Sequence, residues 1–337
     1  MQEVSETQAP ASTERSLPFV VRFFQLFESL GVLFMLIIVL VIMAIIAPAF
    51  FVPTGLTNLV ITASITAVAG FGMTLAIALG GLDLSVGSEQ VLTAIVAAYL
   101  VSTVGIVGAI AGALATGLAI GCVNGLVITK LRVPAFVATL GMMGIARGVA
   151  LIITNGAPIL LTKYDAYTRL NGKVSGIPVP FLIALVALFL FYMLLRHTPF
   201  GRHVCAVGGN LQAAITSGIS VDRVTIVTFM LVGFTAAVSG IMLSAKLAIV
   251  NATLGVGFEL QVIAITVLGG TSLSGGSGNM VGTMIAAILL ASITSALNIL
   301  RVSPYYQYMA YGMLLIFALA LDTVRRDILT RALTRGR

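Results

Sequence analysis

The stretch GGLDLSVGSE, from Gly80 to Glu89, interrupts about seventy residues of otherwise almost unbroken apolar sequence. Its three glycines can leave helical geometry at low cost, and Asp83, Ser85 and Ser88 offer oxygen atoms that can cap a restarting helix. The pattern predicts a break between two membrane-spanning helices whose freed backbone groups are satisfied by these side chains. An ordinary Gly/Ser turn at the membrane surface is the alternative reading.

The composition around this stretch indicates a membrane protein. Of 337 residues, 59% are hydrophobic and 9% are charged, whereas about a quarter are charged in a soluble domain. The net charge of +7 does not indicate nucleic-acid binding, because Lys and Arg residues lie where apolar segments end and form no basic face with interleaved aromatic residues. Cys122 and Cys205 lie far apart and predict neither a disulfide framework nor a metal site.

Apolar runs of about 20 residues are long enough to cross a bilayer as helices. The sequence predicts an all-α polytopic protein with about ten transmembrane helices, some of them short or broken, and the third and fourth meet at Gly105. The predicted spans are approximately 29–50, 58–80, 87–104, 105–127, 136–154, 178–196, 224–246, 258–271, 277–299 and 307–322.

The distribution of basic residues predicts the orientation of these spans. Lys and Arg residues concentrate on the side of the termini, which places both termini in the cytosol under the positive-inside rule. We therefore expect a cytosolic N-terminal tail (1–28), a transmembrane domain (29–322) and a basic cytosolic C-terminal tail (323–337). An external loop (155–177) and a cytosolic loop (197–223) are the two longest connections.

A second stretch, GGTSLSGGS from Gly269 to Ser277, is nearly a copy of the first. Paired interruptions of this kind can mark internal repeats and the walls of a transport path. The candidate residues of the path and helix breaks are Gly81, Asp83, Ser85, Gly87, Ser88, Gly270, Ser272, Ser274 and Gly276.

Four ionisable side chains near or inside the spans are functional candidates, because charge is costly in a membrane. Each also has a structural interpretation. Asp83 can be a cap, Glu89 can face water one turn into its helix, and Arg147 can snorkel or pair within the bundle. Glu259 can lie at a helix N-terminus, where its charge is favourable.

Five segments resemble, in order, the ribose-type permeases, which are the membrane subunits of binding-protein-dependent ABC importers for simple sugars. These are GGLDLSVGS, VPAFVATLGMMGIARG from Val133, TPFGRHVCAVGGNLQAAITSGISV from Thr198, GFELQVIAITVLGGTSLSGGSGNMVGT from Gly257 and SPYYQYMAYGMLLIFALALD from Ser303. The resemblance covers residues 30–325. It implies a bacterial inner-membrane permease subunit that works with an ABC ATPase, a solute-binding protein and a second permease copy within the lipid bilayer.

The resemblance also assigns a role to the 197–223 loop. Asn210, Ala213, Ala214 and Gly218 suit a short capped helix, and in the family the equivalent segment is the coupling helix that docks on the ATPase. The residues that carry this resemblance are Gly208, Gly209, Asn210, Ala213, Ala214, Ser217, Gly218 and Ile219. Gln212 stands where the family often has an acidic residue, which puts a salt bridge with the ATPase in doubt.

The chain has no GxxxxGK[ST] motif and holds no cofactor of its own in this interpretation, so ATP and Mg²⁺ belong to the partner ATPase. An ion-coupled secondary transporter is the competing function, although it would use intramembrane carboxylates, and Asp83, Glu89 and Glu259 all lie at predicted span ends. A membrane-embedded enzyme ranks last, because no HExxH or GxSxG motif is present. We expect specificity to reside in the binding protein and the permease to have no rich polar pocket, so the transported solute stays open.

Overall fold

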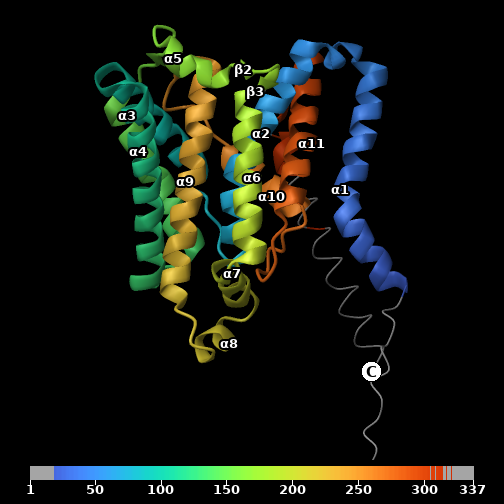
Figure 1. The fold of residues 1–337 in the computed structure, drawn as a ribbon, viewed down its shortest axis with the longest axis vertical. Helices are drawn as coiled ribbons and strands as arrows, with labels where there is room; N and C mark the ends of the chain where they lie inside the picture. Colours follow the sequence, from blue (N-terminus) through green and yellow to red (C-terminus); the bar gives the residue numbers. More distant parts are fainter. Residues whose placement is uncertain (1–18, 304, 308, 314–315, 317–319, 321–337) are drawn as a thin grey trace, which may run out of the picture.

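The chain is a helical bundle with two very small sheets at its surface (Figure 1). The computed structural model describes residues 19–303, 305–307, 309–313, 316 and 320. Its elements are α1 (Phe19–Ile46), η1 (Pro48–Phe51), α2 (Pro53–Ala78), α3 (Val86–Lys130), α4 (Ala135–Thr154), β1 (Ile159–Leu160), α5 (Asp165–Thr168), η2 (Arg169–Asn171), β2 (Lys173–Val174), β3 (Ile177–Pro178), α6 (Val179–His197), α7 (Pro199–Gly209), α8 (Leu211–Thr216), α9 (Val221–Leu247), β4 (Ile249–Val250), α10 (Phe258–Leu268) and α11 (Met280–Ile299).

Helix α3 folds back on itself at Gly105. This glycine has φ 72° and ψ −176°, which is not helical. The Nδ2 atom of Asn124 donates a hydrogen bond of 3.0 Å to Ser85 Oγ, although a straight helix would separate two residues that far apart in sequence by roughly 58 Å. The arms on either side of Gly105 are therefore antiparallel, and the predicted boundary between the third and fourth spans is confirmed.

The number of membrane crossings is confirmed only in part. Among the described residues, six helices are long and apolar enough to cross a membrane, and α3 is one of them. Helix α10 has only 11 residues, and the last predicted span, 307–322, lies partly outside the described residues. The all-α membrane architecture is confirmed, whereas the count of about ten spans and the cytosolic termini stay predictions.

Helix α2 forms the centre of the bundle and packs against α9, α11, α6 and α10. The second arm of α3 packs against α9 through three glycines spaced four residues apart: Gly117, Gly121 and Gly125. A methyl group at Gly125 would lie 2.6 Å from the Cα atom of Ile226. These small residues let the two backbones approach closely, as the sequence predicts.

The two long connections lie at opposite ends of the bundle (Figure 1). The 155–177 segment forms α5, η2, β2 and β3 at one end, where Tyr167 Oη lies 2.8 Å from Ser244 Oγ of α9. Strand β1 pairs antiparallel with β4, with Ile159 opposite Val250. Helices α7 and α8 lie at the other end, on the same side as the first described turn of α1.

Candidate functional site

The first helix break contains a buried polar network. Asp83 and Ser85 are both 0% exposed, and Asp83 Oδ1 accepts hydrogen bonds from the backbone nitrogen (2.8 Å) and the hydroxyl group (2.5 Å) of Ser85. Ser85 is the N-cap residue of α3, and no side chain caps that helix end. The prediction that Asp83, Ser85 or Ser88 caps the helix is therefore wrong, because Asp83 stabilises the turn before the helix instead.

Glu89 belongs to the same network and is fully buried. Its Oε1 atom lies 2.8 Å from Ser85 Oγ and 3.2 Å from Asn124 Nδ2. The interpretation that Glu89 faces water is wrong, because the second arm of α3 folds over it. Ser85 Oγ has a single proton and can donate to only one of its two carboxyl neighbours at a time. If Ser85 Oγ is to form hydrogen bonds with Asp83 and Glu89 at the same time, one of these two carboxyl groups must carry a proton and donate it to Ser85.

Arg147 and Glu259 lie near the start of α10. The Nη1 atom of Arg147 donates to the carbonyl oxygens of Ala252 and Leu254, the latter at 2.7 Å, and so fixes the loop that precedes α10. Glu259 lies in the first turn of α10, as predicted. A methyl group at Gly87 would lie 2.6 Å from Glu259 Oε2, so this glycine permits the close packing of α3 against α10.

The two helix breaks begin with the same backbone turn. After α2, the nitrogens of Gly80 and Gly81 donate to the carbonyls of Ile77 and Ala76, both at 2.9 Å. After α10, Gly270 and Thr271 repeat this pattern with Val267 (2.9 Å) and Thr266 (3.2 Å). Gly80 and Gly270 have left-handed φ values of 90° and 91°, which is the Schellman termination of a helix.

The residues that occupy equivalent positions in the two turns are shifted by one position from those that the sequence match aligns. Matching identical letters pairs Gly80 with Gly269, whereas the backbone pairs Gly80 with Gly270. The second break then ends differently, because Asn279 caps α11 by accepting a 3.0 Å bond from the nitrogen of Gly282. The repeated turn is therefore a local backbone motif, and matching identical residues does not align the two copies correctly.

The predicted coupling segment contacts both breaks through a junction of backbone atoms, formed by Ala78, Gly208, Gly209, Gly275 and Gly276. The nitrogen of Gly276 donates a 2.9 Å hydrogen bond to the carbonyl of Ala78, at the end of α2. A methyl group at Gly208 would lie 2.8 Å from that nitrogen, and one at Gly275 would lie 2.6 Å from Gly208 oxygen. The end of α7 thus lies against both breaks at once. We call these five residues the glycine junction.

Helix α8 protrudes beyond the junction (Figure 1). Asn210 Oδ1 accepts a 2.9 Å bond from the nitrogen of Ala213, which confirms the predicted N-cap. Gly218 has φ 77° and the nitrogen of Ile219 donates to Ala214 oxygen at 3.1 Å, which confirms that Gly218 ends the helix. The predicted docking residues between 208 and 219 thus fall in two places. Gly208 and Gly209 belong to α7 and pack inward, whereas α8 projects outward.

Helix α7 carries a free cysteine, Cys205, which is half-buried. Burial raises the pKa of the Cys205 thiol above its usual value, and the nearby Arg196 charge only partly opposes this effect. A protonated thiol is a poor nucleophile.

The cavities that the described residues form do not bring the predicted path residues together. Asp83, Ser85 and Ser88 are buried within the bundle. Gly81 and Ser274 line a cleft of about 650 Å³ beside Gly208 and α8, and Gly270 lines another of about 510 Å³ that Arg196 also borders. Gly276 lies in the glycine junction, and Ser272 is partly exposed in the second break.

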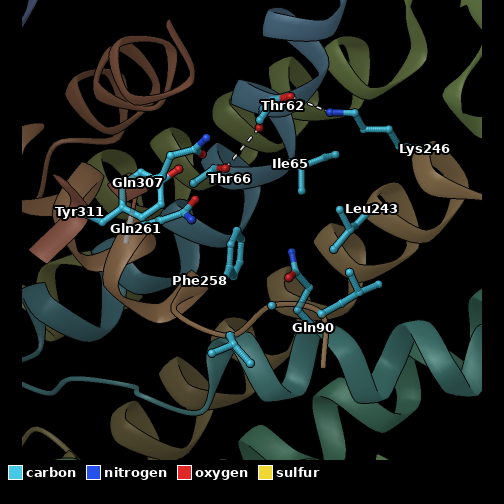
Figure 2. A pocket seen from close by; sticks show the side chains of 13 residues that line it. Thr62, Ile65, Thr66, Gln90, Leu243, Lys246, Phe258, Gln261, Gln307 and Tyr311 are labelled. Atoms are coloured by element: carbon cyan, nitrogen blue, oxygen red, sulfur yellow. Dashed lines mark hydrogen bonds between the residues drawn. The ribbon is translucent and has the colours of Figure 1, made fainter. Parts of the chain in front are cut away.

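A third cavity, of about 260 Å³, lies between α2, α3, α9 and α10 (Figure 2). Its lining combines polar and apolar side chains. The polar residues that line it are Thr62, Thr66, Gln90, Lys246, Gln261, Gln307 and Tyr311. Sequence reasoning missed it because these side chains come from five segments with no common motif. Only Lys246, a cation at the edge of an apolar span, carried a signal.

These features define a multi-pass membrane protein in which α7 contacts two breaks in the bundle and α8 protrudes beyond it. The chain belongs to the family described as "Branched-chain amino acid transport system / permease component", which matches residues 55–319. It is a transport subunit rather than an enzyme.

Curated relatives resemble the chain over most of its length. It is 43% identical to the ribose import permease protein RbsC of Bacillus subtilis (strain 168), over 88% of this chain and 92% of that protein. It is 40% identical to the RbsC protein of Escherichia coli (strain K12), over 86% and 92%. It is 33% identical to the L-arabinose ABC transporter permease protein AraH of Azospirillum brasilense, over 90% of both chains. No solved structure matches.

Proposed function

We propose that the chain is the membrane-spanning permease subunit of an ATP-driven ABC importer for a monosaccharide. The observation that carries this proposal is the contact of α7 with both helix breaks through the glycine junction. The names of its relatives, which include ribose, L-arabinose and D-allose permeases, support a simple sugar as the solute.

The protruding α8 is the docking element for a separate ATPase subunit that binds ATP and Mg²⁺. Leu211 and Ile215 of α8 are 52% and 51% exposed, and two such apolar side chains on a six-residue helix suit insertion into an apolar cleft of a partner. Ala214 is buried against the bundle, so α8 is attached on one side and free on the other. A displacement of α8 acts on α7, and α7 acts on both breaks.

The remaining partners follow from the two ends of the bundle. A solute-binding protein docks at the end formed by the 155–177 segment, and two permease copies enclose the path. Both chain termini are cytosolic in this orientation, and the ATPase end carries basic residues such as Arg202 and Arg223, as the positive-inside rule requires.

Uptake in proteoliposomes tests this proposal. The permease is reconstituted with its ATPase, a ribose-binding protein and ATP, and uptake of radiolabelled D-ribose is measured. Uptake that requires the ATPase and hydrolysable ATP supports the proposal. Uptake by the permease alone, driven by a proton or sodium gradient, contradicts it and favours the ion-coupled transporter.

A further inference from the structure

Gln90, a buried residue that lines the cavity of Figure 2, has a hydrogen-bond partner for its amide nitrogen but none among the described residues for its amide oxygen. Gln90 is 0% exposed, lies one turn into α3 and points into the cavity. Its Nε2 atom donates a 2.7 Å hydrogen bond to Ser239 Oγ of α9. Its Oε1 atom is buried and has no hydrogen-bond partner among the described residues. A buried acceptor without a donor is unfavourable, so a hydrogen-bond donor at this oxygen would stabilise the site.

The orientation of the Gln90 amide is fixed by its neighbour. Ser239 Oγ also lies 2.8 Å from the carbonyl oxygen of Ile65. A carbonyl can only accept, so the single hydroxyl proton of Ser239 goes to Ile65 and Ser239 must accept from Gln90. The amide therefore turns its nitrogen toward Ser239, and its buried oxygen lies near Gly255 in the loop that lines the cavity. A ligand hydroxyl that reaches this oxygen would meet an acceptor whose orientation is fixed.

The opposite wall offers donors. Lys246 in the last turn of α9 donates a 2.6 Å bond from Nζ to Thr62 Oγ1 (Figure 2), and an ammonium group has three protons. The salt bridge found among the described residues joins Lys130 to Asp222, so within that part of the chain Lys246 has no carboxylate partner. None of the described lining residues is acidic. This lining disfavours cationic ligands.

An aromatic surface completes the lining. The ring of Phe258, at the start of α10, faces the cavity between Gln90 and Gln261 (Figure 2). A sugar ring carries hydroxyl groups that donate and accept, and an apolar C–H face that packs on an aromatic ring. The volume of about 260 Å³ lies just below the usual range for small-molecule pockets, about 300–1,000 Å³, which suits a solute of monosaccharide size.

We propose that this cavity is a low-affinity binding subsite for a neutral polyhydroxylated solute, with the Gln90 oxygen accepting from a solute hydroxyl and Phe258 packing on its apolar face. The proposal deepens the function proposed above and rests on it, because it locates a step of the path within one permease chain. Ser239 is a positioning residue that holds the Gln90 amide.

Intrinsic fluorescence tests the subsite directly, because the chain contains no tryptophan. Phe258→Trp places the only tryptophan of the chain in the cavity, where it can be excited selectively over tyrosine, and keeps an aromatic face. D-ribose titrated into the purified full-length permease should change its emission, with half-saturation at about 1–100 mM. The matched control is Phe189→Trp, on a 61% exposed ring of α6 outside the cavity, which should not respond.

Second-site variants identify the group responsible. In the Phe258→Trp background, Gln90→Leu should raise the half-saturating ribose concentration about three- to tenfold, because it removes one hydrogen bond. Ser239→Ala should have a smaller effect in the same direction, since the amide can then rotate, and Gln90→Glu should restore an acceptor. D-Glucosamine, which is cationic, should bind more weakly than ribose.

No change in emission up to about 100 mM ribose, or an equal change in the Phe189→Trp control, would overturn the subsite. Equal titration curves for Gln90 and Gln90→Leu would overturn the role of Gln90. This assay contains neither ATPase nor binding protein, so its failure is separate from that of the proposed function. ATP-driven uptake in proteoliposomes with no fluorescence response would reject the subsite and keep the permease assignment.

Discussion

The backbone nitrogen of Gly276 donates a 2.9 Å hydrogen bond to the carbonyl oxygen of Ala78, and this bond joins the two helix breaks. The last carbonyls of a helix have no partner within it, so the second break satisfies a group that the end of α2 leaves open. Gly208 packs against the same two residues from α7. A movement of α7 therefore cannot leave either break unaffected.

Replacing Gly208 with alanine should destabilise the folded permease by about 1–3 kcal/mol, because the added methyl group would overlap backbone atoms of Ala78 and Gly276 that have little room to move. The neighbouring Gly209→Ala is the matched control, since its methyl group would meet Gly276 Cα at 3.7 Å, an ordinary contact. Thermal unfolding in detergent measures both variants. Equal melting temperatures for the two would show that the junction is not tightly packed.

Replacing Asp83 with alanine should lower the yield of folded protein, because the buried nitrogen of Ser85 loses its acceptor and the Ser85 hydroxyl keeps only Glu89 as a carboxyl neighbour. Asp83→Asn should restore much of the yield, since an amide oxygen can accept from the same nitrogen. Size-exclusion chromatography of detergent extracts measures folded monodisperse protein. A normal yield of Asp83→Ala with impaired transport would instead indicate a role in the path.

Replacing Asn124 with leucine should weaken the contact between the two arms of α3. Asn124 donates to Ser85 Oγ and Glu89 Oε1, and both acceptors are buried. Loss of these donors should lower the free energy of unfolding by roughly 1–3 kcal/mol. Thr116→Val is the control, because Thr116 only bonds to Gly112 of its own arm. Similar unfolding curves for both variants would show that the hydrogen bonds of Asn124 do not stabilise the packing of the two arms of α3.

Replacing Gly218 with valine should distort the end of α8 while leaving the chain inserted in the membrane. Gly218 has φ 77°, which a β-branched residue adopts only with strain. We expect less ATPase to co-purify with this variant. We also expect less solute to be imported for each ATP hydrolysed. Gly218→Asn is the control, because asparagine tolerates the left-handed region. Wild-type levels of co-purified ATPase with Gly218→Val would count against docking at α8.

The sequence predicts those features that short segments determine. Gly105 reverses α3 because a glycine alone suits its backbone, and Asn210 and Gly218 bound α8 because capping is local. The burial of Glu89 is not local, since it depends on Asn124 approaching from the second arm. For the same reason, the glycine junction and the cavity around Gln90 could not be predicted.

The most direct test of the account is the ratio of D-ribose imported to ATP hydrolysed in proteoliposomes that contain the permease, its ATPase and the binding protein. The ratio is compared for the wild type, Gly209→Ala and Gly208→Ala, each normalised to folded, ATPase-bound permease. We predict an unchanged ratio for Gly209→Ala and a ratio at least about tenfold lower for Gly208→Ala. An unchanged ratio in Gly208→Ala would contradict transmission through the glycine junction.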